Sequence, residues 1–181
     1  MPLACLCGTL GAHHSGLLIA LLVLAFSSSS TQLTRAAVLN NYDAPLYLSC
    51  PGNQGIVSVA SWHSNHAEDR VWSFGCAKVG YSLSGYTWTG YLNNLDGPLS
   101  YSCGGNRVIT GIKSYHDDGT EDRVWAVQCG DLNGATLTNC AFGPQANGYD
   151  APIDVKAGDY SVITGIQSTH DNGAGKVPVT T

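Results

Sequence analysis

The sequence predicts an all-β domain made of three similar units. Segments 40–76, 93–129 and 147–181 align with one another at a spacing of about 53 residues, so the chain carries an internal repeat. Each segment contains a run rich in Val, Ile, Thr and Tyr, residue types that favour strands. Hydrophobic residues make up 44% of the 181-residue chain and charged residues only 12%, a composition typical of a folded domain rather than a disordered chain.

The first element along the chain is an unbroken apolar run at residues 17–26, followed by a run of serines. A helix of this length extends about 15 Å, well short of a bilayer core, so the run is typical of a signal peptide. A buried core helix is the alternative interpretation. We expect a signal peptide at residues 1–30, cleavage between residues 27 and 37, and no transmembrane segment.

The repeated domain follows at residues 38–181. Each unit opens with an Asp-Ala-Pro or Asp-Gly-Pro turn, in which the proline disfavours helix for the preceding residue. These turns begin at Asp43, Asp96 and Asp150. A short apolar stretch and a Gly-containing turn lead to a longer strand in each unit. We expect these strands at residues 56–62, 108–115 and 162–169.

The first two units continue into a second strand, RVWSFGC or RVWAVQC. The two-residue period of a strand places Trp72 on the face of Cys76, and Trp125 on the face of Cys129. The third unit has Gly-Lys-Val at residues 175–177, where the others have Glu-Asp-Arg, and the sequence ends before a final Trp and Cys. We therefore expect this unit to lack its last strand and to expose a sheet edge.

Three units of this kind indicate pseudo-threefold closure, because closure removes exposed sheet edges. A three-sheet, β-prism-like domain fits the repeat length better than a β-trefoil-like one, and both alternatives stay open.

The cysteines predict disulfides within units. The interval from Cys50 to Cys76 equals that from Cys103 to Cys129, and disulfides persist in exported proteins. A loop of this size stabilises the fold by about 3.5 kcal/mol in the chain-entropy account. Loss of the signal peptide removes Cys5 and Cys7 and leaves Cys140 without a partner, which would allow self-association through Cys140 or through the open third unit.

The pattern W-x-G-Y-x-N-x-x-D-x-P-x-x-Y-x-C, followed by G-I-x-S-x-H and E-D-R-V-W-x-x-x-C, resembles the dermatopontin family over residues 40–175. The resemblance implies a secreted extracellular-matrix or adhesion protein with disulfide loops and no enzymatic activity. It also implies glycosaminoglycan binding or cell agglutination, because several members have those properties.

Two E-D-R triplets supply the candidate ligand-binding residues. Their carboxylates can accept hydrogen bonds from sugar hydroxyls, and their guanidinium groups can bind a sulfate in bidentate fashion. The structural alternative, which we favour, is that the Asp side chains accept turn amides and the Arg side chains pair locally. The six residues are Glu68, Asp69, Arg70, Glu121, Asp122 and Arg123.

The loop at residues 116–122, HDDGTED, suggests calcium, but its spacing is not that of an EF-hand, and the first unit has only His-Ser-Asn-His-Ala-Glu in the same place, at residues 63–68. C-x-x-C pairs and Cys/His clusters of the zinc type are also absent from the sequence. We expect no metal and no cofactor. His63, His116 and His170 occupy equivalent positions, and we expect them to serve structural hydrogen bonds on three separate faces.

The formal net charge of −5 and the eight scattered Lys and Arg residues argue against nucleic acid as a partner. No nucleophile elbow or metal pair suggests a hydrolase. We therefore expect a secreted, noncatalytic protein of the extracellular matrix that binds glycans, proteoglycans or matrix proteins. The alternative is a defence agglutinin or a membrane-active cytotoxin.

Overall fold

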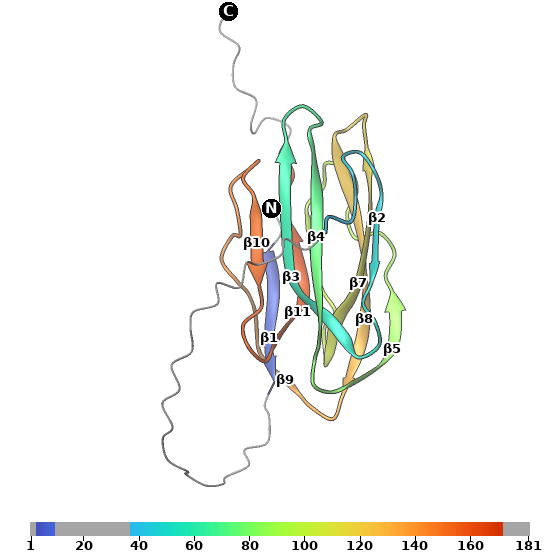
Figure 1. The fold of residues 1–181 in the computed structure, drawn as a ribbon, viewed down its shortest axis with the longest axis vertical. Helices are drawn as coiled ribbons and strands as arrows, with labels where there is room; N and C mark the ends of the chain where they lie inside the picture. Colours follow the sequence, from blue (N-terminus) through green and yellow to red (C-terminus); the bar gives the residue numbers. More distant parts are fainter. Residues whose placement is uncertain (1–2, 10–36, 172–181) are drawn as a thin grey trace, which may run out of the picture.

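The computed structural model describes residues 3–9 and 37–171 (Figure 1). The prediction of an all-β fold is confirmed, because every regular element in these ranges is a strand. Along the chain the strands are β1 Leu3–Thr9, β2 Leu46–Ser49, β3 Gln54–Ser64, β4 Asp69–Lys78, β5 Ser82–Trp88, β6 Leu99–Ser102, β7 Arg107–Asp117, β8 Asp122–Asn133, β9 Leu137–Phe142, β10 Ile153–Lys156 and β11 Ser161–Ser168. No helix within these ranges is long and apolar enough to span a membrane.

The strands form three separate sheets, with orders β10-β3-β4, β2-β7-β8-β5 and β6-β11-β1-β9. The short strand of each unit pairs with the long strand of another unit: β2 with β7, β6 with β11, and β10 with β3. The three units are therefore interlocked in a ring. This exchange gives the sheets their pseudo-threefold relation, while the finer choice between a prism and a trefoil stays a prediction.

The core lies where the long strands β3, β7 and β11 contact one another. Ile56, Ile109 and Ile163 occupy equivalent positions on these strands, and each is at most 2% exposed. Trp72 and Trp125 meet edge to face with ring centroids 4.8 Å apart, and both belong to the same buried cluster. The apolar residues of all three β-rich runs thus contribute to one common core.

Two disulfides join the pairs that the sequence spacing predicts. Cys50 is bonded to Cys76 and Cys103 to Cys129, each across 26 residues. Each bond links the segment after a short strand to the closing strand of the same unit. The two disulfides therefore link residues within one unit, while the strand exchange joins each unit to the next.

The third sheet contains a strand that the repeat pattern does not predict. Strand β1, from the N-terminal end of the chain, pairs with β11 and places Leu6 opposite Ile163. In the first unit, Cys76 of β4 lies opposite the equivalent residue, Ile56, so β1 takes the place that β4 has in that unit. Beside it, β9 pairs with β1, as β5 pairs with β8.

Two expectations are therefore wrong for the chain as described. The edge of β11 is not open, because β6 and β1 flank it, and Cys140 is not unpaired, because it is bonded to Cys7. The physical reason is that a distant segment can complete a sheet as well as a neighbouring one. Residues 172–181, the end of the third unit, lie outside the described residues.

The expected signal peptide stays a prediction. Its apolar run and its cleavage region, residues 17–37, fall almost entirely outside the described residues, which resume at residue 37. Cleavage after residue 30 would remove β1 and Cys7. The exported form would then have the open β11 edge and the unpaired Cys140 that the full chain lacks.

Candidate functional site

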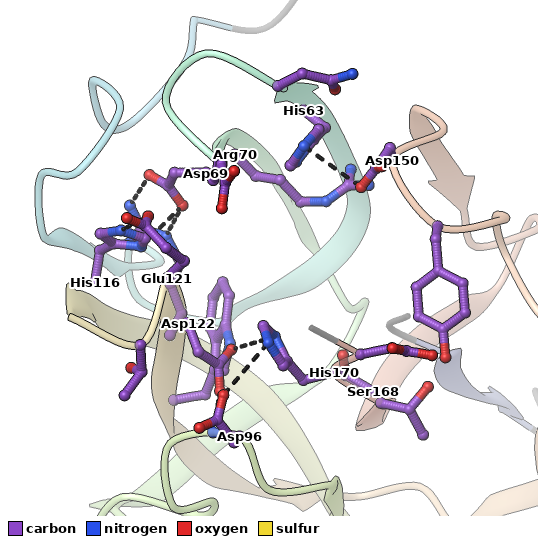
Figure 2. Close-up of a pocket in the computed structure, with 18 of the residues that line it drawn as sticks. His63, Asp69, Arg70, Asp96, His116, Glu121, Asp122, Asp150, Ser168 and His170 are labelled. Carbon is purple, nitrogen blue, oxygen red and sulfur yellow. Dashed lines mark hydrogen bonds and ion pairs between the residues drawn. The ribbon is translucent and has the colours of Figure 1, made fainter. Parts of the chain in front are cut away.

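A polar cavity of 510 Å³ opens at one end of the domain, where the loops of all three units meet (Figure 2). All six residues of the two E-D-R triplets line it. So do His63, His116 and His170, so the expectation that these histidines lie on three separate faces is wrong. Interlocking of the units directs equivalent strand ends to the same end of the domain.

Pairs of Asp and His side chains connect the units around the cavity. In each pair, the Asp of an Asp-Ala-Pro or Asp-Gly-Pro turn faces the His of another unit, with an oxygen-to-nitrogen distance of 3.4 to 3.7 Å. The pairs are Asp43 with His116, Asp96 with His170, and Asp150 with His63. The sequence did not reveal these pairs, because each one joins two different units.

The turns hold the three Asp side chains in place through an unusual backbone conformation. Asp43, Asp96 and Asp150 have φ values of 62°, 58° and 57°, in the left-handed region that Asp and Asn tolerate better than most residues. The backbone N–H of Asp43 donates to Asp69 Oδ2, and that of Asp96 donates to Asp122 Oδ2, both at 2.8 Å. The triplet Asp residues thus accept turn amides, as the structural interpretation expects.

A repeated Asn fixes the strand that follows each triplet. Asn40 Oδ1 accepts the backbone N–H of Trp72 at 2.9 Å, and its amide donates to the Arg70 carbonyl at 3.0 Å. Asn93 makes the same two contacts with Trp125 and Arg123. The Asn side chain of each unit therefore fixes the backbone at the triplet of the same unit.

Asp69 and Arg123 form a buried bidentate ion pair between two units. The Nε and Nη2 atoms of Arg123 donate to the two oxygens of Asp69 at 2.6 Å, and the two side chains are 5% and 3% exposed. Burial on its own would raise the pKa of Asp69. The hydrogen bonds and charge of Arg123, together with backbone N–H groups of Arg70 and Asp43, outweigh it and lower that pKa.

Arg70 occupies the equivalent position in the first unit, and the sequence of the third unit has Lys176 where the other units have Asp69 and Asp122. Its Nη2 donates to the Ala151 carbonyl at 3.0 Å, as Arg123 Nη2 does to the Ala44 carbonyl. Its Nη1 is buried and has no hydrogen-bond partner among the described residues. Desolvation lowers the pKa of Arg70, against the raising effect of the charges of Asp150 and Asp69.

The lining is rich in hydrogen-bonding groups and predominantly acidic. Seven carboxylates line the cavity, against two arginines, of which one is engaged by Asp69. Trp72 and Trp125 also contribute to the lining, although they are only 5% and 8% exposed. The acidic residues are Glu68, Asp69, Asp96, Glu121, Asp122, Asp150 and Asp171. Such a site can accept many hydrogen bonds and offers a guanidinium donor at Arg70.

The fold and the site define a disulfide-bonded β domain of three interlocked units with one shared polar cavity. The Dermatopontin family matches residues 40–176, and the chain belongs to this family. Dermatopontins are proteins of the extracellular matrix. No solved structure matches the chain.

The chain is similar to three characterised relatives from different organisms. The chain is 37% identical to "Dermatopontin" of Biomphalaria glabrata over 135 residues, which cover 75% of this chain and 90% of the relative. It is 36% identical to "Hemagglutinin/amebocyte aggregation factor" of Limulus polyphemus over 155 residues, 84% of this chain and 88% of the relative. It is 35% identical to "Millepora cytotoxin-1" of Millepora dichotoma over 134 residues, 74% of this chain but only 60% of that relative.

Proposed function

We propose that the chain is a secreted, noncatalytic adhesion protein of the extracellular matrix that binds glycans in the cavity. The observation that carries the proposal is the gathering of carboxylates, two guanidinium groups and two Trp rings in a single cavity built by all three units, with Nη1 of each guanidinium lacking a hydrogen-bond partner among the described residues. Carboxylates accept hydrogen bonds from sugar hydroxyls, and Arg70 Nη1 can donate one. The volume of 510 Å³ is within the range of small-molecule sites.

The charge of the cavity favours a neutral saccharide over a sulfated one. A sulfate placed among these seven carboxylates would be repelled, and the two guanidinium groups of the lining, one of them already paired with Asp69, are too few to balance them. The glycosaminoglycan binding that the family resemblance implies would therefore have to use another surface. A neutral sugar ring meets no such repulsion and can use the acceptors that line the wall.

The agglutinin alternative is supported by the relative from Limulus, which is named a hemagglutinin and amebocyte aggregation factor. Agglutination requires at least two binding sites in one particle, and the cavity is one site per chain. Removal of β1 with the signal peptide would supply a route to dimers, because it leaves Cys140 and the edge of β11 free to pair with a second copy. The cytotoxin alternative is supported by the relative from Millepora alone, through a match to 60% of its length.

A glycan array with the full chain, read together with a red-cell agglutination and lysis assay, tests the proposal. We expect binding to neutral glycans, and at least tenfold weaker binding by an Arg70→Gln variant that melts like the wild type. Lys156→Gln is the matched control, because it removes a positive charge from an exposed position on β10, outside the cavity. Binding to sulfated glycans alone, or equal binding by both variants, would contradict the proposal, and lysis without glycan binding would favour the cytotoxin.

A further inference from the structure

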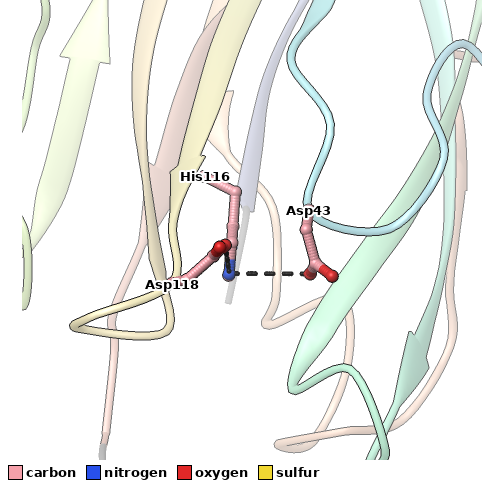
Figure 3. Close-up of side chains that lie close together, drawn as sticks. All are labelled: Asp43, His116 and Asp118. Carbon is pink, nitrogen blue, oxygen red and sulfur yellow. Dashed lines mark ion pairs between the residues drawn. The ribbon is translucent and has the colours of Figure 1, made fainter.

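One side of the cavity carries a cluster of carboxylates around a single buried imidazole. Nε2 of His116, at the end of β7, lies 3.7 Å from Asp43 Oδ1, 3.6 Å from Asp118 Oδ1 and 3.3 Å from Glu121 Oε2. Asp118 and Glu121 belong to the β7–β8 hairpin loop, whereas Asp43 comes from the turn before β2 in another unit. Figure 3 shows Asp43 and Asp118 approaching the imidazole from two different loops.

The imidazole has no hydrogen bond to any residue that the structure describes. The His116 side chain is 1% exposed, and within residues 3–9 and 37–171 neither Nδ1 nor Nε2 has a hydrogen-bond partner. Buried polar nitrogens in folded proteins nearly always have a partner, so this pair of atoms calls for one. Because Nε2 is directed toward three carboxylates, the missing partner is one that would bind imidazole and carboxylates together.

From this arrangement we propose that His116, Asp43 and Asp118, whose ligand atoms all lie within 4.8 Å of one another, bind a divalent cation of the zinc type, with the Glu121 carboxylate 3.3 Å from Nε2 beside them. Ligand atoms placed tetrahedrally at zinc distances are about 3.4 Å from one another. The three nitrogen-to-oxygen distances at His116, from 3.3 to 3.7 Å, are close to that value. Calcium prefers six to eight oxygen ligands and magnesium an octahedron of oxygens, so a nitrogen ligand favours zinc over both.

The electrostatics of the cluster support a cation. Three carboxylates that face the same imidazole nitrogen repel one another, and a divalent ion removes that repulsion. On the other side of the ring, His116 Nδ1 lies 3.4 Å from Asp69 Oδ1, and Arg123 holds Asp69 in place. A carboxylate behind a metal-binding histidine orients the ring and raises its basicity. The site is open to solvent, because the Asp118 side chain is 84% exposed.

The other units provide a natural comparison within the same chain. In the first unit, Asn65 stands in the place of Asp118, and His63 faces a single carboxylate, that of Asp150, at 3.4 Å. In the third unit, His170 has Asp96 and Asp122 near it, but the sequence places Asn172 where the second unit has Asp118. Asp96, Asp122 and His170 also lie within 4.8 Å of one another, but their two carboxylates face opposite nitrogens of the imidazole, whereas Asp43 and Asp118 face the same nitrogen of His116.

The test is a titration of the full chain with ZnCl₂, after treatment with EDTA and with free thiols blocked. We expect one Zn²⁺ bound per chain and a higher melting temperature with Zn²⁺ than with Ca²⁺ at the same concentration. Asp118→Asn should weaken Zn²⁺ binding at least tenfold, and it recreates the Asn of the first unit without changing a buried group. Co²⁺ in place of Zn²⁺ should give the visible absorption of a tetrahedral site.

The matched controls are Asp159→Asn, which removes one exposed carboxylate elsewhere, and His63→Gln, which changes the equivalent histidine. Both should bind Zn²⁺ within twofold of the wild type, whereas His116→Gln should not bind it. The proposal is overturned if the wild type takes up no Zn²⁺, or if Asp118→Asn binds as tightly as Asp159→Asn. In the first case His116 is simply an imidazolium that pairs with its carboxylates. Because Asp118 is exposed, its variant keeps the test valid even if His116→Gln fails to fold.

Discussion

Replacing Asp69 with Asn should destabilise the protein more than any other single change among the cavity carboxylates. Asp69 and Arg123 are 3% and 5% exposed, and Asn would leave the buried guanidinium without a counter-charge. Loss of one partner of a buried ion pair costs about 3–5 kcal/mol. We expect a loss of about 3 kcal/mol, the lower end, because the Asn oxygen can still accept the backbone N–H of Asp43. The measurement is the free energy of unfolding from denaturant titration at pH 7.

Asp122→Asn is the matched control, because Asp122 accepts the same turn amide in the second unit. The sequence has Val177 where the second unit has Arg123, and the charged partner of Asp122 among the described residues is His170, with 3.2 Å between Asp122 Oδ1 and His170 Nδ1. We expect Asp122→Asn to cost about 1 kcal/mol or less, because the Asn oxygen can still accept the Asp96 amide and the pair with His170 is partly exposed. Equal losses for the two variants, or a loss below about 1 kcal/mol for Asp69→Asn, would refute the argument from the buried charge.

The same pair of variants gives a pH test. The pKa of Asp69 is lowered in the folded state from its ordinary value of 3.8. Its contribution to stability is therefore fully present above pH 3.8 and is lost as the pH falls through the lowered folded-state pKa. The difference in stability between the wild type and Asp69→Asn should be constant near neutral pH and should shrink in acid. A difference that grows in acid would contradict the assigned direction.

Three further predictions concern the core, the N-terminal strand and the signal peptide. Trp72→Ala should cost about 3–5 kcal/mol, because the ring is 5% exposed and packs against Trp125; near-wild-type melting would place the ring outside the core. In the full chain, Cys7→Ser should cost about 2–5 kcal/mol, because the disulfide to Cys140 closes a loop across 133 residues. N-terminal sequencing of the exported protein tests the signal peptide: a start between residues 28 and 38 means that β1 is removed, and a start at Met1 contradicts the predicted cleavage.

The repeat made most of the fold predictable. Equal spacing of Cys50, Cys76, Cys103 and Cys129 was enough to predict both intra-unit disulfides, because equivalent residues in repeated units occupy equivalent places. The closing strand of the third unit was not predictable in the same way. Residues 3–9 precede the apolar run and align with no part of the repeat, so nothing in their pattern indicates pairing with β11.

The candidate site was predicted in its residues but not in its geometry. The E-D-R triplets stood out because they are copied intact, and both line the cavity. The convergence of His63, His116 and His170 was missed, because a sequence repeat defines positions within a unit and says nothing about the direction in which the units face. The partners of these histidines also come from other units, as in the pair of Asp43 with His116. Only a structure of the interlocked ring brings those residues together.

The most direct test of the central claim is a map of backbone amide shifts by nuclear magnetic resonance, on addition of the neutral glycan that binds best on the array. We predict that the shifted amides come from all three units and cluster around the cavity, at residues such as Arg70, Glu121 and Asp150. Shifts confined to the outer face of the β2-β7-β8-β5 sheet, where Tyr47 packs against Trp88 and Lys113 lies over the Trp88 ring, would contradict it and would move the glycan site to that aromatic surface.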